Sequence, residues 1–435
     1  MISHISDAHI ACITLGCAKN EVDTAHMQQR LRACGFSLTD DPENADAIII
    51  NTCSFIQSAT EESLEAIFEA AGYENVNAGA PLIVTGCMPA RYGDDLAQEL
   101  TEACAFVPCS KEDDIAEVVA HALGVPLTTK EEMPQDEFAL MSPGVFAYVK
   151  ISDGCDRFCS YCTIPFIRGR YHSFTYEAIS KEVSQLVKQG VKEIVLIAQD
   201  TGRWGSDFEQ PLSLAWLVNK LAKAFPHTWF RVMYIQPEGI TDELLEVVEQ
   251  HSNVCSYFDI PLQHVEPALL KAMNRRGSYE EFIELINHIK ERVSNVVLRT
   301  TLIAGFPGET EEQFENLCSF VEEGYFDYVG VFAYSREEGT KAYNLPDQIE
   351  EDEKNYRAQT LRDIADNVCA LKVAERIGKT FEVLIEGSEE DGQLYGRAQC
   401  QAPEVDGVTY VDNGIPGEII PVTIEDTLLY EMEGA

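Results

Sequence analysis

Two groups of three cysteines are the residues of this chain whose type and spacing indicate chemistry. In the first group, Cys155, Cys159 and Cys162 have a Cys-x3-Cys-x2-Cys spacing in a loop that follows an apolar strand. Thiolates at this spacing can bind three irons of one iron–sulfur cluster, which normally takes four cysteines, so one iron stays open. Zinc is an alternative, but zinc sites usually have a fourth Cys or His nearby, and His172 follows ten residues later without a pairing pattern. Three uncoordinated core thiols are the remaining alternative.

The second group, Cys17, Cys53 and Cys87, has no short pattern, because its members are 36 and 34 residues apart. Their local settings are alike: each follows an apolar strand and a short lead, and Gly16 and Gly86 directly precede two of them. In a parallel sheet the three strand ends share the carboxyl edge, where ligands bind. We therefore expect the three thiolates to converge on a second cluster with an open iron, although a single free cysteine is more often a core residue.

The other eight cysteines show no matched setting, and we expect them to be packing residues. They are Cys12, Cys34, Cys104, Cys109, Cys255, Cys318, Cys369 and Cys400. Cys104 and Cys109 bracket a further strand, which makes them the nearest competitors for a ligand role. Fourteen cysteines without a basic, apolar leader indicate a reducing compartment, so we expect a cytoplasmic protein with few or no disulfides. No stretch approaches about 18 consecutive apolar residues, so no membrane span is expected.

The charge of the chain restricts its partners. There are 32 Lys and Arg residues against 73 Asp and Glu, a net charge of −41, whereas a hydrophobic fraction of 45% is ordinary for a folded protein. A surface this acidic repels phosphate backbones and attracts basic partners. General nucleic-acid binding and overall disorder are therefore not expected. A solvated acidic surface without a specific partner is the plain alternative.

The first part of the chain, residues 1–125, alternates short apolar runs with amphipathic segments such as 21–34 and 58–71. This alternation is typical of a parallel sheet covered by helices, so the fold class is α/β. The strands are expected at residues 10–15, 47–50, 82–85 and 105–107. Residues 126–143 are rich in acidic residues and contain several prolines, which indicates a linker.

The same alternation begins again in the second part, residues 144–374. Six βα units indicate a partial (β/α)6 barrel of the TIM type, followed by a helix over residues 351–376. The barrel strands are expected at residues 146–151, 193–197, 230–235, 257–260, 296–303 and 328–332. The last part, residues 375–435, has short segments separated by Asp-Gly and Asn-Gly turns, which predicts a small antiparallel β-barrel. Its strands are expected at residues 381–385, 394–398, 408–411, 418–424 and 427–430.

The first cysteine group, with Tyr161 before its last cysteine, resembles the cluster loop of the radical S-adenosylmethionine (SAM) superfamily. A leading domain with three distant cysteines, a radical domain and a terminal barrel of the TRAM kind together resemble the methylthiotransferases over nearly all 435 residues. The resemblance implies SAM and two [4Fe–4S] clusters, a radical cluster on the first group of cysteines and an auxiliary cluster on the second. It also implies that SAM binds the open iron of the radical cluster.

Residues 15–23, LGCAKNEVD, resemble the branch of methylthiotransferases that modifies an aspartate of small-subunit ribosomal protein twelve; the tRNA-modifying branch usually has Gln-Met in place of Ala18-Lys19. Further family-like segments are residues 164–170, 258–264 and 301–310. Residues 375–435 hold 3 Lys or Arg and 14 Asp or Glu, a net charge of −11, whereas a barrel that binds tRNA should be basic. An acidic barrel suits a basic ribosomal protein, alone or within the 30S particle, so tRNA is not the expected substrate.

The resemblance implies that SAM at the radical cluster yields a radical that removes a hydrogen atom from the aspartate β-carbon, and that the auxiliary cluster supplies the sulfur. A cellular electron donor is then required. An unactivated C–H bond is beyond any side-chain base, so the cofactor carries this step and no catalytic side chain is predicted. Two other functions stay open: the same chemistry on a tRNA adenosine, and a two-cluster electron carrier without a substrate of its own.

Loops at the carboxyl ends of barrel strands hold the chemistry of such folds. Gln199 and Asp200 follow the second barrel strand and are predicted to bind the methionine part of SAM. The residues predicted to border the adenine are Ile303, Ala304, Gly305 and Phe306, which end the fifth strand. The simpler alternatives are a helix cap at Asp200 and a turn after Phe306.

Four arginines stand out in so acidic a chain. Arg168 and Arg170 follow the cluster loop and are hypothesised to steer an acidic target side chain. Arg275 and Arg276 form a second local basic spot. Exposed arginines more often have no specific role.

Overall fold

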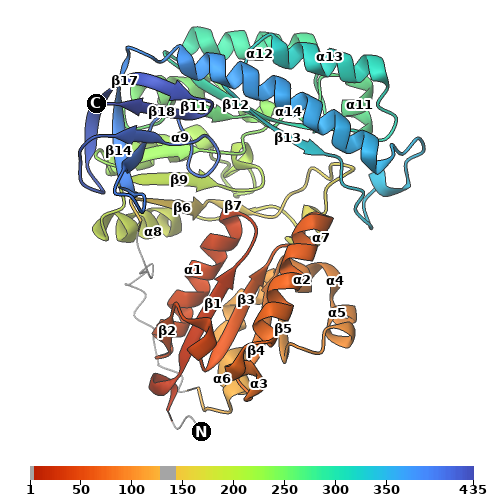
Figure 1. Cartoon of the computed structure of the whole chain (residues 1–435), viewed down its shortest axis with the longest axis vertical. Helices are drawn as coiled ribbons and strands as arrows, with labels where there is room; N and C mark the ends of the chain where they lie inside the picture. The colour runs from red at the N-terminus through yellow and green to blue at the C-terminus, as the bar shows by residue number, and fades with distance from the viewer. Residues whose placement is uncertain (1–3, 128–143) are drawn as a thin grey trace. The chain divides into compact units, whose positions relative to one another are not determined.

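The chain divides into two units, and the cysteine loop of the first group contributes residues to both. The structure, a computed structural model, describes residues 4–127 and 144–435 (Figure 1). The first unit holds the described residues up to 127 together with Asp153–Asp156 and Cys162–His172, and the second holds residues 144–152, Arg157–Tyr161 and Ser173–Ala435. Most of the predicted linker, residues 128–143, lies outside the described residues.

The first unit is built on a five-stranded parallel sheet. Its strands are β1 (His9–Thr14), β2 (Ser37–Thr39), β3 (Ala47–Thr52), β4 (Leu82–Gly86) and β5 (Ala105–Pro108). They are ordered β2-β1-β3-β4-β5, so the chain reverses its direction of winding between β1 and β3. The predicted parallel α/β domain is confirmed. The sequence missed β2, because three residues without an apolar run carry no periodic signal.

Helices cover both faces of this sheet. They are α1 (Ala18–Ala33), α2 (Gln57–Ala71), α3 (Glu74–Asn77), α4 (Cys87–Tyr92), α5 (Asp94–Glu99) and α6 (Ile115–Leu123), with α7 (Ile164–Ile167) added from the cysteine loop. Alternate residues of β3 enter opposite cores: Ile49 packs with α1 and α6, whereas Ile48 and Ile50 pack with α2. Each buried Ile side chain stabilises the fold by about 1.5–3 kcal/mol. Helices therefore cover the side chains on both faces of the sheet, and the ends of the strands are the part that helices leave uncovered.

The second unit contains six parallel strands in chain order. They are β6 (Phe146–Lys150), β9 (Glu193–Ile197), β10 (Trp229–Val232), β11 (Tyr257–Asp259), β12 (Val297–Ala304) and β13 (Tyr328–Ala333). Regular ladders join β6, β9 and β10, and likewise β11, β12 and β13. A bridge between Phe230 and Val254 and a hydrogen bond from Ile235 N to Asp259 O connect the two ladders. The predicted partial barrel is therefore confirmed.

Most helices of the second unit begin at side-chain caps. Seven helices belong to this unit: α8 (Tyr176–Lys188), α9 (Leu214–Ala224), α10 (Asp242–Gln250), α11 (Pro267–Ala272), α12 (Tyr279–Arg292), α13 (Glu311–Glu322) and α14 (Glu351–Ala374). In five of them a Ser or Thr hydroxyl accepts a hydrogen bond from the backbone N–H three residues on; the caps are Thr175, Ser213, Thr241, Ser278 and Thr310. Each cap contributes about 1 kcal/mol. The caps fix where the loops between strands and helices end, and these loops carry the candidate site.

The last part of the chain forms a closed five-stranded barrel. Its strands are β14 (Thr380–Ser388), β15 (Leu394–Ala398), β16 (Thr409–Val411), β17 (Ile419–Leu428) and β18 (Glu431–Gly434), closed in the order β14-β15-β16-β18-β17. The expectation of two strands at 418–424 and 427–430 is wrong, because residues 419–428 form the single strand β17 and residues 429–430 form a turn. A bulge between Ile424 and Asp426 shifts the register there, which breaks the alternation in the sequence without ending the strand. The fifth strand is β18.

A buried network of charges joins the closed barrel to the partial barrel formed by β6 and β9–β13. Arg231 Nε lies 2.7 Å from Glu193 Oε1, and Arg397 Nη2 lies 2.7 Å from Glu193 Oε2 and 2.5 Å from Glu386 Oε1. Burial alone would raise the pKa of Glu193, but the two guanidiniums outweigh it and hold that pKa below its ordinary value. The ion pair between Arg397 and Glu193 therefore links the two barrels.

Removing Arg397 should destabilise the protein strongly, because Glu193 would stay buried with one of its two partners lost. We expect Arg397→Met to lower the apparent free energy of unfolding by about 3–5 kcal/mol. Urea titration followed by circular dichroism measures this change. The control is Lys372→Met, which removes a partly exposed pair with Glu375 at 3.9 Å and should change stability by about 0–1 kcal/mol. Equal midpoints for the two variants would contradict the role given to the buried network.

Candidate functional site

The second group of cysteines lies at the carboxyl ends of three adjacent strands. Cys17 follows β1 and precedes α1, Cys53 follows β3, and Cys87 follows β4 as the first residue of α4. Asn20, three residues after Cys17, links two of these loops, because its Oδ1 lies 3.8 Å from Cys87 Sγ. Strands β1 and β3 flank the point where the winding direction reverses, which is where open α/β sheets bind their ligands.

Buried amide side chains hold these strand ends together. Asn20 Nδ2 donates to the carbonyl of Leu15 at 2.8 Å and to that of Thr52 at 3.1 Å, so one side chain ties the ends of β1 and β3. Asn51 Nδ2 returns a hydrogen bond to Asn20 O at 2.9 Å. The Thr52 hydroxyl donates to Thr85 O at 2.6 Å, which adds β4. Hydrogen bonds from these buried donors fix the geometry of the loops that follow.

Two glycines allow the backbone to pass close to the thiols. Gly16 has φ +97°, and a Cβ on it would lie 2.4 Å from Cys53 Cβ and 2.9 Å from Cys53 Sγ. Gly86 has φ +94°, and a Cβ there would lie 2.2 Å from Asn51 Oδ1. Both distances are impossible for real atoms, so only glycine fits at either position.

Burial keeps two of these thiols protonated in the absence of a ligand. Desolvation raises the pKa of Cys87 to about 12, and the nearby Arg168 guanidinium opposes this rise. The pKa of Cys53 is also raised, again chiefly by burial. Iron binds thiolates, so filling this site releases protons and supplies the charge stabilisation that an apolar pocket lacks. Three thiols without a carboxylate ligand, two of them on buried cysteines and that of Cys17 on an exposed one, fit an iron–sulfur cluster better than a hard cation.

The structure contradicts the steering role hypothesised for Arg168. Its side chain is only 3% exposed and pairs with Asp23 Oδ2 at 2.5 Å, within the first unit. It therefore cannot meet a substrate from solvent. Arg170 differs: it is 76% exposed and lies 3.0 Å from Asp156.

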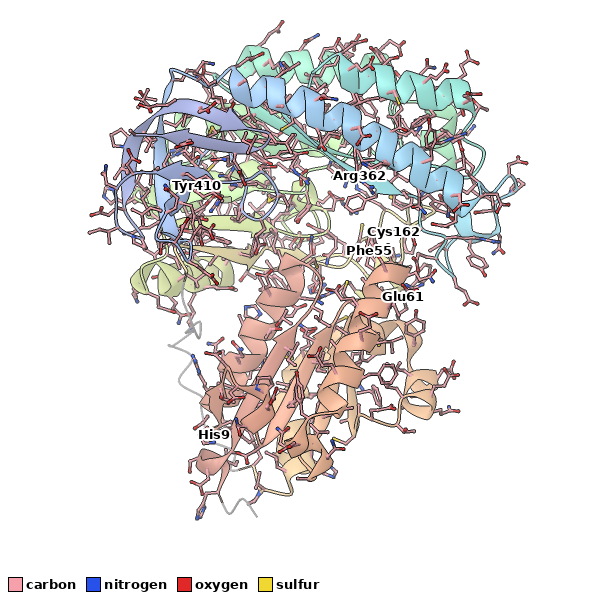
Figure 2. All side chains as sticks on the ribbon, in the orientation of Figure 1. His9, Phe55, Glu61, Cys162, Arg362 and Tyr410 are labelled. Atoms are coloured by element: carbon pink, nitrogen blue, oxygen red, sulfur yellow. The ribbon has the colours of Figure 1, made fainter. Side chains whose placement is uncertain are left out.

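The first group of cysteines is divided between the two units. Cys155 and Cys162 belong to the first unit and Cys159 to the second. In the first unit, Cys155 N donates to Gly169 O at 3.2 Å. Thr163, next to Cys162, donates from its hydroxyl to Phe55 O at 3.1 Å, and Figure 2 labels Cys162 and Phe55. The loop after Cys162 is thus bonded to the loop after Cys53.

Among residues 4–127 and 144–435, no three His, Cys, Asp or Glu side chains form a group that could hold a single metal ion. Ligands of a four-iron cluster bind different iron atoms, so they are spaced more widely than the ligands of one ion.

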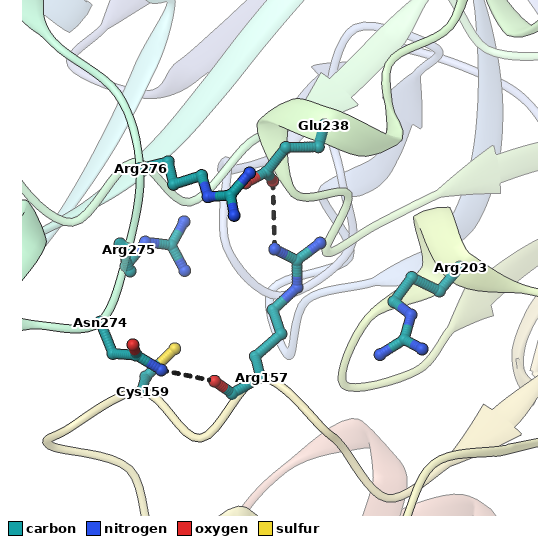
Figure 3. Close-up of a pocket in the computed structure, with 7 residues that line it drawn as sticks. All are labelled: Arg157, Cys159, Arg203, Glu238, Asn274, Arg275 and Arg276. Atoms are coloured by element: carbon teal, nitrogen blue, oxygen red, sulfur yellow. Dashed lines mark hydrogen bonds and ion pairs between the residues drawn. The ribbon is translucent and has the colours of Figure 1, made fainter.

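Cys159 lines a cationic pocket of about 320 Å³ in the second unit (Figure 3). The lining residues are Arg157, Cys159, Arg203, Glu238, Asn274, Arg275 and Arg276. Arg157 donates from Nε to Asp200 Oδ2 at 2.5 Å and from Nη1 to Glu238 Oε2 at 3.1 Å. Asn274 Nδ2 donates to the Arg157 carbonyl at 2.9 Å, which holds the cysteine loop against the segment after α11. Four guanidiniums against one lining carboxylate, that of Glu238, give this pocket a positive charge within an acidic chain.

The predicted SAM contacts lie at the ends of β9 and β12. Both amide atoms of Gln199 are buried and have no hydrogen-bond partner in the part of the chain that the structure describes. Asp200 is fully buried; burial raises its pKa, and its bond to Arg157 opposes this rise. At the end of β12, Ile303 and Phe306 pack in one cluster with Tyr161 of the cysteine loop. The structure thus brings the end of β12 to the cysteine loop.

The remaining predicted SAM contacts are backbone positions rather than side chains. Ala304 is buried, and Gly305 has φ +78° with the Lys354 side chain filling the place of a Cβ. The sequence missed Arg157, Arg203 and Asn274 as parts of the pocket. Arg157 lies inside the cysteine loop, and this position is the sequence feature that could have indicated a place in the pocket.

Known proteins agree with this architecture. Residues 9–107 match the uncharacterized protein family UPF0004, residues 149–321 match the radical SAM superfamily, and residues 377–435 match the TRAM domain. A relative from Natranaerobius thermophilus, named ribosomal protein uS12 methylthiotransferase RimO, is 41% identical over 98% of each chain. The chain belongs to the RimO methylthiotransferase family. A second RimO protein, from Clostridioides difficile, is 42% identical, again over 98% of each chain.

Solved structures share the fold of this RimO family member. The radical SAM methyltransferase TsrM from Kitasatospora setae is 14% identical, with a TM-score of 0.57 over 77% of this chain and 74% of its own. The cobalamin-dependent enzyme OxsB is 11% identical, with a TM-score of 0.52 over 82% of this chain and 56% of its own. At these identities the likeness concerns the fold alone. Among the described residues, no helix is both long and apolar enough to span a membrane.

Adding one methyl group at Gly16 should remove the second cluster, because the new Cβ would displace Cys53. We expect Gly16→Ala to lower iron after anaerobic reconstitution from about eight atoms per chain to about four. Elemental analysis with sulfide assay measures this. Gly79→Ala is the matched control, since Gly79 has φ +109° but nothing within 4 Å of the added atom. Full iron content in Gly16→Ala would contradict the site.

Proposed function

We propose that this chain attaches a methylthio group to the β-carbon of an aspartate in ribosomal protein uS12. The observation that carries the proposal is the placement of Cys17, Cys53 and Cys87 at the ends of adjacent strands, in the unit that also holds Cys155 and Cys162. A second cluster with an open iron provides a position for sulfur that the radical cluster alone does not. The names of the full-length relatives support the same reaction and substrate.

The cofactors of the family are SAM and [4Fe–4S] clusters, and the residues of this chain fit them. We assign the radical cluster to Cys155, Cys159 and Cys162, and the auxiliary cluster to Cys17, Cys53 and Cys87. When bound, these groups supply the radical cleavage of the C–H bond and the methylthio sulfur. The two unpartnered amide atoms of Gln199, buried at a strand end, fit a ligand with polar groups of its own.

The protein side chains bind and orient rather than react. Asp200 is already bonded to Arg157, so Gln199 is the better candidate for the methionine part of SAM. Tyr161 packs against the apolar cluster that contains Phe306 at the end of β12, which fixes this part of the cysteine loop. Asp200 in turn fixes Arg157 within the cysteine loop.

The cationic pocket beside Cys159 suits a carboxylate, and the target aspartate has one. Arg276 is exposed and forms no ion pair among the described residues, so its guanidinium is available to a ligand. Bidentate pairing of guanidinium with carboxylate gives both affinity and orientation. We assign Arg276 to the aspartate carboxylate of the substrate.

The acidic closed barrel supports a basic protein partner over tRNA, since residues 375–435 carry a net charge of −11. Domain boundaries at 125, 143 and 374, a cytoplasmic location and a cellular electron donor belong to the same proposal. A tRNA adenosine substrate is the alternative. A two-cluster electron carrier is no longer favoured, because carrying electrons needs no cationic pocket beside a cluster cysteine.

Substituting one cysteine from each group should separate the two halves of the reaction. Cys159→Ala is expected to abolish 5′-deoxyadenosine, whereas Cys53→Ala should still form it but transfer no methylthio group. Mass spectrometry of uS12, with nucleoside analysis of tRNA in parallel, measures the transfer. A Cys53→Ala enzyme that still modifies uS12 normally would disprove the auxiliary assignment. Methylthio transfer to tRNA alone would replace the proposed substrate.

Substituting Arg276 should weaken binding of the protein substrate and leave SAM binding unchanged. Loss of one charge-assisted pair is expected to raise the KM for uS12 about 10- to 100-fold in Arg276→Gln. Formation of 5′-deoxyadenosine without substrate should stay unchanged. Arg292→Gln, an exposed arginine 3.6 Å from Asp242 and outside the pocket, is the control. An equal loss of SAM affinity would mean that Arg276 binds the carboxylate of SAM instead.

A further inference from the structure

Arg168 is a buried cation whose neighbours belong to the auxiliary site. Its Nη1 lies 2.5 Å from Asp23 Oδ2 and 3.5 Å from Asp153 Oδ2. Its Nη2 donates to Asn20 Oδ1 at 2.7 Å and to Cys87 Sγ at 3.6 Å. All of these residues belong to the first unit. The guanidinium therefore makes contact with one of the proposed ligand sulfurs.

Burying this guanidinium costs free energy, and a role in the auxiliary site would explain why it is buried. A buried ion pair is often no more stable than an apolar pair of the same size, so the pairing with Asp23 does not by itself explain Arg168. A planar guanidinium can, however, donate to several acceptors at once, and it keeps its charge at any pH the protein meets. Here its second nitrogen turns away from Asp23 toward an amide oxygen and a sulfur.

Asn20 extends the reach of Arg168 to the other two cysteine loops. Its Oδ1 accepts from Arg168, while its Nδ2 donates to the carbonyls of Leu15 and Thr52. Those carbonyls immediately precede the loops of the other two auxiliary cysteines. The direct contact to Cys87 completes the set. One arginine is thus bonded, directly or through one amide, to all three ligand loops.

We propose that Arg168 is a positioning residue of the auxiliary cluster, orienting the sulfur of Cys87 and raising the reduction potential of the cluster. Hydrogen bonds to sulfur and local positive charge favour the reduced, more negative form of a cluster. The inference rests on the proposed function, because it takes Cys17, Cys53 and Cys87 as cluster ligands. It explains why an arginine from the loop that follows Cys162 is buried against α1.

The test isolates the auxiliary cluster in the full-length chain. The parent protein carries Cys155→Ala, Cys159→Ala and Cys162→Ala together, so only the auxiliary cluster can form. Arg168→Gln is added to this parent, and the iron and sulfide per chain, the affinity for iron and the midpoint potential are measured. We expect apparent iron affinity to fall about 10- to 100-fold and the midpoint potential to become more negative.

Two further variants separate this role from a purely structural one. Arg168→Lys keeps the charge but loses the forked geometry, so its potential should lie between those of the parent and Arg168→Gln. Asp23→Asn combined with Arg168→Gln removes both members of the buried ion pair. This double variant should regain stability in thermal unfolding, yet keep the more negative potential. Arg170→Gln is the matched control and should leave both measurements at the parent values.

Defined outcomes would overturn the inference. If Arg168→Gln and Arg170→Gln have the same midpoint potential and iron affinity, Arg168 does not act on the cluster. If the double variant regains the parent potential, Arg168 only balances the charge of Asp23. In both cases the parent still holds its cluster, and the proposed function stands. A parent without any cluster would instead remove the proposed ligand set, and with it the role of Arg168.

Discussion

The hydrogen bonds of one buried amide, Asn20, fix the spacing of the strand ends that carry the second group of cysteines. A thiolate can serve a cluster only where the backbone holds it, and parallel strands bring their carboxyl ends to a single edge. Asn20 ties the ends of β1 and β3 by donating to the carbonyls of Leu15 and Thr52. Gly16 then lets the chain turn within contact of Cys53. The loops are therefore held by the sheet before any ligand binds.

Much of this arrangement is readable from the sequence, because it follows from local patterns. Apolar runs predict the strands, and a cysteine at the same place after three of them predicts their convergence. The same reasoning was bound to fail for Arg168. Its partner Asp23 is 145 residues away, and nothing near either residue distinguishes a buried arginine from an exposed one. Arg170, two residues later, has the same local sequence signal and is exposed.

The cationic pocket could not be predicted from the sequence for a related reason. It is assembled from the cysteine loop, from the turn that carries Arg203, from Glu238 after β10, and from the segment after α11. Each segment alone holds one or two ordinary polar residues, and only the curvature of the partial barrel brings them together. For the strand β17 the difficulty is different. Its apolar pattern is present in the sequence, but a bulge of one residue interrupts that pattern, so the sequence predicts two strands.

The closure of the terminal barrel has a consequence for how a partner can be held there. Each of its five strands pairs on both sides, from β14 through β15, β16 and β18 to β17 and back to β14. An extended peptide therefore cannot join this barrel as an additional strand, as it would at an open sheet edge. A partner that touches the barrel must be distinguished by its side chains and by the shape of the loops, so a flexible tail gains little there without a folded surface beside it.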